Sequence, residues 1–222
     1  MHGWIDIETP HGPVRGWRAE PPGPSKGAVV VIQEIFGVNA HIRSVAERLA
    51  DAGFMALAPA LFDPVEHGVE LGYDDAGVQR ARALVTALGT ERAMDVINAS
   101  AERLQMEGMR VGAVGFCWGG TLAFLCATRL SLPAVSYYGA RSVPFLDEKA
   151  GAPVMFHFGA DDNSIPSKDI DLHRQKQPQA QVFVYEGTGH AFNRDVDPKV
   201  YGAEAAKLAW QRTLEFLEAQ LR

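Results

Sequence analysis

The stretch Gly115-Phe116-Cys117-Trp118-Gly119-Gly120 decides how the rest of this chain is organised. It follows a short apolar run over 110–114, which we expect to be a buried strand, and it opens an apolar segment over 121–129, which we expect to be a helix. A side chain on such a sharp strand-to-helix turn is pushed out of the sheet, and the flanking glycines let neighbouring backbone come close. The pattern predicts a nucleophile elbow that carries a thiol in place of the usual serine hydroxyl.

The predicted turn places Cys117 at the amino terminus of a helix. There the helix dipole and the unbonded N–H groups favour a thiolate. The alternative interpretation of the same residues is a buried structural cysteine beside packing glycines. Residues elsewhere in the chain are needed to distinguish a catalytic Cys117 from a structural one.

Composition and charge limit the class of protein. The 222 residues are 47% hydrophobic and 22% charged, which suits a globular protein, and we expect one domain over 1–222. A net charge of −6 without any block of lysine and arginine disfavours a nucleic-acid partner. Two cysteines cannot form a disulfide framework, and the chain shows neither a signal-peptide pattern nor an apolar run long enough to span a bilayer. These features predict a cytoplasmic protein without a membrane partner.

Apolar patterns predict strands that alternate with helices. The alternation predicts an α/β fold: a mostly parallel central sheet with helices on both faces, preceded by an antiparallel N-terminal hairpin. In the last helix we expect Trp210, Leu214, Leu217 and Leu221 to form the buried face. The expected strands cover 4–8, 14–19, 28–32, 54–58, 110–114, 134–138, 153–158 and 181–185.

Candidate acid and base residues follow the last two predicted strands. Asp161 and Asp162 come after the strand over 153–158, and His190 comes after the strand over 181–185. Nucleophile, acid and histidine in this order match the chain order of α/β-hydrolase triads. An imidazole takes the proton of the thiol and returns it to the leaving oxygen, and a carboxylate orients that imidazole. Each residue alone could belong to an ordinary turn, but the ordered set favours catalysis.

Three motifs resemble those of the dienelactone hydrolase (carboxymethylenebutenolidase) family of the α/β-hydrolase superfamily. They are Gln33-Glu34-Ile35-Phe36-Gly37-Val38-Asn39, the Cys117 elbow, and Gly189-His190-Ala191-Phe192-Asn193-Arg194. The resemblance covers nearly the whole chain and implies an α/β-hydrolase fold. Asp162 stands three residues after Gly159 and four before Pro166, as the triad acid of the family does, and this spacing selects Asp162 over Asp161.

The resemblance also implies roles for individual residues. Cys117 would be the nucleophile, His190 the base and Asp162 the residue that orients it. The backbone N–H groups of Trp118 and Ile35 would form the oxyanion hole. Glu34 would contact the resting thiol, disfavour the thiolate and move when a substrate carboxylate arrives. Without the neighbouring motifs, a solvated charge at a strand end would be the preferred interpretation of Glu34.

Substrate contacts follow less directly from the motifs. Arg194 matches a family arginine that holds the carboxylate of the lactone, a task that suits the guanidinium fork. A second family arginine lies near Leu84, where this chain has Arg80 and Arg82, neither cleanly in register; either could instead make a surface ion pair. We expect the remaining substrate-binding positions to be Arg82, Phe36, Tyr138 and Phe192.

These observations predict a hydrolase that opens a carboxylated enol-lactone through an acyl-cysteine. We expect a small anionic lactone or ester as the substrate, a monomer or weak homodimer, and no metal or cofactor, because His157 and His173 lack ligand-like spacing. Two alternatives remain open. One is a generic thiol esterase or another cysteine hydrolase of the amidotransferase type, although those normally show His-x-Glu where this chain has His190-Ala191-Phe192. The other is a redox sensor that uses Cys117 and Glu34, which would need no general base.

Overall fold

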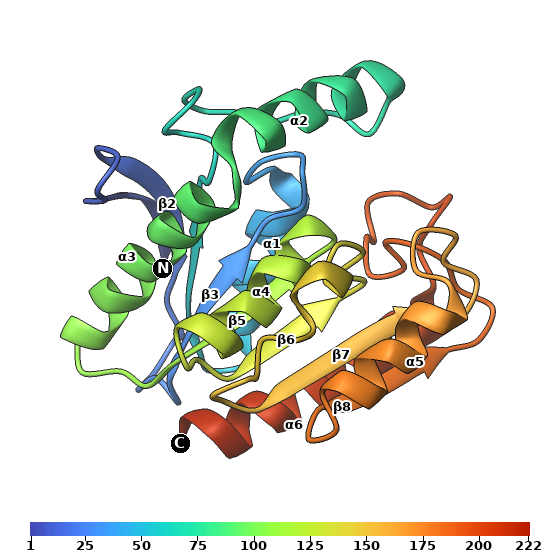
Figure 1. Cartoon of the computed structure of the whole chain (residues 1–222). Helices are drawn as coiled ribbons and strands as arrows, with labels where there is room; N and C mark the ends of the chain where they lie inside the picture. Colours follow the sequence, from blue (N-terminus) through green and yellow to red (C-terminus); the bar gives the residue numbers. More distant parts are fainter. The chain divides into compact units, whose positions relative to one another are not determined.

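A computed structural model describes residues 1–222, and the chain forms two compact units. The first comprises Met1–Gly112 together with Leu221–Arg222, and the second comprises Ala113–Gln220. Both units contain strands and helices (Figure 1). The expectation of a single domain over 1–222 stays a prediction.

The first unit contains four strands in the order β1-β2-β4-β3. They are β1 (His2–Ile7), β2 (Val14–Ala19), β3 (Ala28–Ile32) and β4 (Met55–Pro59). The pairs β1–β2 and β2–β4 are antiparallel, whereas β3–β4 is parallel. Every residue of β3 and β4 is buried, as expected for continuous apolar runs that are covered on both faces.

Three helices belong to the first unit: α1 (Ala40–Asp51), α2 (Asp75–Leu88) and α3 (Thr90–Met106). Helix α1 begins where the side chain of Asn39 accepts the Ile42 N–H at 3.2 Å, and it ends before Gly53, whose φ of 99° favours glycine. Helices α1 and α3 lie on opposite faces of the four strands, and α2 packs against α3 (Figure 1).

The second unit contains parallel strands whose carboxyl ends share one edge. Its strands are β5 (Val111–Phe116), β6 (Ala134–Tyr137), β7 (Val154–Gly159) and β8 (Gln181–Tyr185), and they pair in this order. The first two residues of β5 are assigned to the first unit, which extends to Gly112. Helices α4 (Trp118–Arg129) and α5 (Ser167–Lys176) cover one face and α6 (Ala203–Leu221) covers the other, while η1 (Val143–Phe145) lies in the loop after β6 (Figure 1). Residues at the carboxyl ends of β5, β7 and β8 are therefore placed near one another.

Helix α4 starts earlier than the apolar segment over 121–129 predicts. It begins at Trp118, directly after Cys117, so three residues of the elbow motif are already helical. The helix is buried on nearly all sides, which explains why it is apolar without an amphipathic stripe.

The predicted buried face of α6 is wrong in part. Trp210 and Leu214 are only half-buried. Thr213 is fully buried instead. Its hydroxyl lies 2.6 Å from the Tyr137 hydroxyl and 3.2 Å from His157 Nε2, and these hydrogen bonds replace the contacts that the hydroxyl would make with water. A polar residue can occupy the buried face when its hydrogen bonds are satisfied there. The buried positions are Ala206, Ala209, Thr213, Phe216, Leu217 and Leu221.

None of the helices combines the length and the apolar character needed to traverse a lipid bilayer.

Candidate active site

Cys117 joins β5 to α4 in a sharply turned backbone. Its φ of 55° and ψ of −119° lie outside the regions that non-glycine residues normally occupy, a strain that is typical of functional positions. The Cys117 N–H donates to Tyr137 O at 3.0 Å, and the Cys117 carbonyl accepts the Gly120 N–H at 2.9 Å. A Cβ on Gly115 would lie 1.9 Å from Gly119 O, so only glycine permits this approach of helix to strand. The turn presents the thiol at the carboxyl end of β5.

The structure brings Cys117, His190 and Asp162 together. His190 Nε2 lies 3.1 Å from Cys117 Sγ, and His190 Nδ1 lies 2.7 Å from Asp162 Oδ2. The Asp162 side chain is fully buried, whereas Asp161 is exposed. The Asp162 carboxylate, and not that of Asp161, is therefore the one that meets the imidazole. The geometry can hold an Nδ1–H tautomer and a proton between Nε2 and sulfur.

Ser164 is a supporting residue that the sequence analysis did not single out. Its backbone N–H donates to Asp162 Oδ1 at 2.8 Å, which fixes the carboxylate oxygen that does not meet His190. The signal for this bond is present in the sequence, because aspartate in a turn commonly accepts the N–H two residues ahead.

The loops that carry the acid and the base are tied to each other by backbone contacts. The Ala160 N–H donates to Tyr185 O and the Asp161 N–H donates to Thr188 O, both at 2.9 Å. A Cβ on Gly159 would lie 2.4 Å from Thr188 O. These contacts hold the loop that carries Asp162 against the loop that carries His190.

Of the predicted pocket aromatics, Tyr138 lies beside the imidazole and Phe192 packs on Tyr138. The Tyr138 and His190 rings meet edge to face with centroids 5.2 Å apart, and Phe192 meets Tyr138 in the same way at 5.5 Å. Tyr138 and Phe192 are fully buried. Tyr138 and Ala191, the residue after His190, both have positive φ, 41° and 64°, which non-glycine residues rarely adopt. Tyr138 therefore packs directly on the imidazole, and Phe192 supports Tyr138 from behind.

Opposing effects determine the protonation of His190. Burial lowers its pKa, but the hydrogen bonds to Asp162 and Cys117, together with the charges of both groups, outweigh burial and raise the pKa to about 10. His190 therefore keeps its proton at neutral pH. The protonated imidazole lies within hydrogen-bond reach of the Cys117 sulfur, and it can pass its proton to a leaving oxygen.

We expect this shift to appear in the pH dependence of hydrolysis. Below its pKa, His190 can donate a proton to a leaving oxygen; above it, that proton is lost, so kcat/KM should decline as pH rises through about 10. Asp162→Asn removes the largest of the raising effects, so the alkaline decline should move to lower pH. The measurement is a kcat/KM profile from pH 6 to 11, corrected for spontaneous hydrolysis. Asp161→Asn is the control, and an alkaline limb that stays in place in Asp162→Asn would contradict this assignment.

His157 and His173 are buried away from the triad and hydrogen-bond to neighbouring groups. His157 Nδ1 lies 2.8 Å from the Tyr185 hydroxyl, and burial, followed by the charge of Arg212, lowers the His157 pKa to about 3. Burial also lowers the pKa of His173, whose Nδ1 lies 2.7 Å from Asp169 O. No three His, Cys, Asp or Glu side chains of the chain converge in an arrangement that could hold a metal ion.

The other predicted site residues in the first unit are Glu34, Ile35, Phe36 and Arg82. Glu34 is fully buried, and Phe36 packs edge to face on Tyr73 with centroids 4.8 Å apart. Arg82 is exposed on α2. The neighbouring Arg80 forms an ion pair with Glu66.

Arg194 lies in the loop after β8, four residues beyond His190. Its side chain is only 8% exposed, and its Nη1 lies 3.5 Å from Asp197 Oδ2. The backbone of the same loop is closed by the Arg194 N–H, which donates to Ala191 O at 2.9 Å. Arg194 is thus a nearly buried cation on the segment that carries the base.

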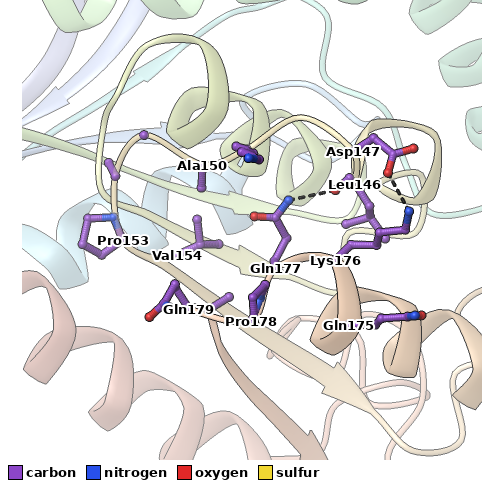
Figure 2. Close-up of a pocket in the computed structure, with 14 residues that line it drawn as sticks. Leu146, Asp147, Ala150, Pro153, Val154, Gln175, Lys176, Gln177, Pro178 and Gln179 are labelled. Carbon is purple, nitrogen blue, oxygen red and sulfur yellow. Dashed lines mark hydrogen bonds and ion pairs between the residues drawn. The ribbon is translucent and has the colours of Figure 1, made fainter.

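The second unit also has a pocket of about 780 Å³ at the amino ends of its strands (Figure 2). It is lined by residues around the start of β7 and by the segment between α5 and β8, including Val154 and Gln177. The triad lies at the opposite ends of the strands, where sites in parallel sheets form. The pocket is therefore separate from the triad.

The Dienelactone hydrolase family profile matches residues 14–221. The chain belongs to the dienelactone hydrolase family. It is 34% identical to a carboxymethylenebutenolidase of Pseudomonas putida, over 93% of this chain and 90% of that protein. It is also 34% identical to a protein of Synechocystis provisionally named carboxymethylenebutenolidase, over 98% of this chain and 96% of the relative.

Solved structures agree with this family membership. A crystal structure from Klebsiella pneumoniae subsp. pneumoniae MGH 78578, provisionally named dienelactone hydrolase, aligns with a TM-score of 0.85 at 30% identity, covering 99% of this chain and 98% of the other. The predicted α/β-hydrolase fold, with its mostly parallel sheet and antiparallel N-terminal hairpin, is confirmed. The prediction of a hydrolase of the dienelactone hydrolase type is likewise confirmed.

Proposed function

We propose that this family member opens the ring of a carboxylated enol-lactone by covalent catalysis through Cys117. The observation that carries the proposal is the contiguous array from sulfur to imidazole to carboxylate, with contacts of 3.1 and 2.7 Å. A thiol within hydrogen-bond reach of an oriented base is the arrangement that covalent acyl transfer requires.

The reaction has an acylation half and a deacylation half. The Cys117 thiolate attacks the lactone carbonyl carbon, forming a C–S bond while the carbonyl electrons move to oxygen. The tetrahedral oxyanion then collapses, the ring C–O bond breaks, and the leaving enol oxygen takes the proton from His190. In deacylation, His190 accepts a proton from water as the water oxygen attacks the acyl carbon, and the C–S bond breaks to release the acid.

The oxyanion needs hydrogen-bond donors, and we assign this role to the backbone N–H groups of Trp118 and Ile35. Trp118 is the first residue of α4 and directly follows the nucleophile, the position of one oxyanion donor in nucleophile elbows. The restraint of the resting thiol by Glu34 is supported by the family motif and stays a prediction.

Two observations support a carboxylated lactone as the substrate class. Relatives of this chain carry the name carboxymethylenebutenolidase, and Arg194 provides a cation close in sequence to the base. A guanidinium fork can donate to both oxygens of a carboxylate.

We expect Arg194→Met to damage hydrolysis of an anionic lactone far more than that of its neutral methyl ester. Losing a charge-assisted, largely desolvated contact costs about 2–3 kcal/mol, or roughly 30- to 150-fold in kcat/KM. The measurement is kcat/KM of wild type and variant on both substrates.

Arg174→Met is the matched control. Arg174 also pairs with an aspartate three residues away, Asp171 at 3.0 Å, but on the exposed surface of α5. Equal losses on the two substrates in Arg194→Met, accompanied by a lower Tm, would show that Arg194 is structural. The carboxylate assignment would then be withdrawn, leaving a generic thiol esterase.

A further inference from the structure

We propose that Gln33 is a positioning residue that fixes the direction of the Ile35 N–H. The inference rests on the proposed function, in which this N–H binds the oxyanion. Gln33 directly follows β3 and is fully buried, and the sequence analysis assigned it no role of its own.

The Gln33 carboxamide makes two hydrogen bonds to backbone. Its Nε2 donates to Glu34 O at 3.1 Å, and its Oε1 accepts the Leu61 N–H at 3.1 Å. The partners determine which amide atom is which, because an N–H must meet the oxygen and a carbonyl must meet the nitrogen. Leu61 follows β4, the parallel neighbour of β3. Gln33 therefore ties the loop after β3 to the loop after β4.

The bond to Glu34 O acts on the next N–H through peptide geometry. The carbonyl of Glu34 and the N–H of Ile35 belong to one peptide unit, which is planar and trans, since the chain has no cis peptide bond. The two groups therefore point in opposite directions. Holding the Glu34 oxygen toward Gln33 turns the Ile35 N–H away from Gln33 and prevents the peptide from rotating.

The Ile35 N–H itself has no acceptor within the chain. Ile35 is half-buried, so its N–H is available to an oxygen that enters the site. A donor that is fixed in direction and left without a partner suits an oxygen that becomes negative during the reaction, because no reorganisation is needed at that moment. Gln33 holds the Ile35 N–H in its direction through the hydrogen bond to Glu34 O.

The test separates oxyanion stabilisation from attack by sulfur. Gln33→Met is nearly isosteric and removes both hydrogen bonds. We expect kcat for ester hydrolysis to decline about 10- to 100-fold, a fraction of the loss for removing a donor outright, with KM nearly unchanged. The rate of Cys117 alkylation by iodoacetamide should stay within about twofold of wild type, because attack on a saturated carbon creates no carbonyl oxyanion.

A second variant covers the case in which Gln33→Met does not fold. Gln33→Leu removes the same two hydrogen bonds with a shorter apolar side chain, so a clash of the methionine methyl group cannot cause its effects. It should show the same selective loss of hydrolysis over alkylation.

Gln177→Met is the matched control. Gln177 is another buried carboxamide, whose Nε2 donates to Leu146 O at 2.9 Å and to Glu148 O at 2.8 Å, in the pocket at the amino ends of the strands (Figure 2). This variant should lower Tm and leave kcat unchanged.

The outcomes are distinct. Unchanged hydrolysis in the Gln33 variants, or parallel losses of hydrolysis and alkylation, would overturn the positioning role. The proposed function fails on a different result, namely hydrolysis by wild type that survives complete alkylation of Cys117.

Discussion

Cys117→Ala should abolish ester hydrolysis while leaving the protein folded. Without the thiol no acyl-enzyme can form, and removing the nucleophile from a catalytic unit costs at least about 10⁴-fold in kcat. Loss of one sulfur from a half-exposed position leaves the apolar contacts of α4 intact, so Tm should change little. The measurements are kcat on an aryl ester and thermal unfolding.

Cys126→Ala is the internal control for the first variant. Cys126 is fully buried on the same helix, and burial raises its pKa, so this thiol stays protonated and unreactive. Its loss should cost about 1 kcal/mol of stability and almost no activity. Wild-type turnover in Cys117→Ala would rule out the thiol mechanism.

His190→Ala should produce the second large loss. The imidazole transfers the proton in both halves of the reaction, so we expect a decline of about 10⁴- to 10⁶-fold in kcat. Asp162→Asn should cost less, about 10²- to 10⁴-fold, because the carboxylate only orients the imidazole and stabilises its charge. Single-turnover acylation by an aryl ester measures the chemical step directly.

Asp161→Asn is the matched control for the acid. Asp161 is exposed, and its contact with the base loop is through the backbone N–H to Thr188 O, which the substitution keeps. Activity should remain close to wild type. Equal losses in Asp161→Asn and Asp162→Asn would show that the acid is wrongly assigned.

Much of the architecture follows from local patterns in the sequence. A continuous apolar run predicts β3 with its observed bounds, because buried parallel strands need apolar residues on both faces. The predicted bounds of β8 also match, although only Tyr185 of that strand is buried. The Cys117 elbow is predicted because few other contexts require glycines on both sides of a nucleophile. The chain order of cysteine, acid and histidine depends only on which strand each residue follows. These features are local, so sequence suffices to determine them.

Long-range contacts determined the rest of the molecule. The burial of Thr213 on α6 depends on hydroxyl and imidazole partners from β6 and β7, which no helical periodicity contains. The raised pKa of His190 is a balance between burial and hydrogen bonds to two neighbours 28 and 73 residues away. The brace that Gln33 makes to Leu61 spans 28 residues and appears only when β3 and β4 pair. Hydrogen bonds and electrostatic effects of this kind depend on distances and directions between distant segments, so only the tertiary structure could decide them.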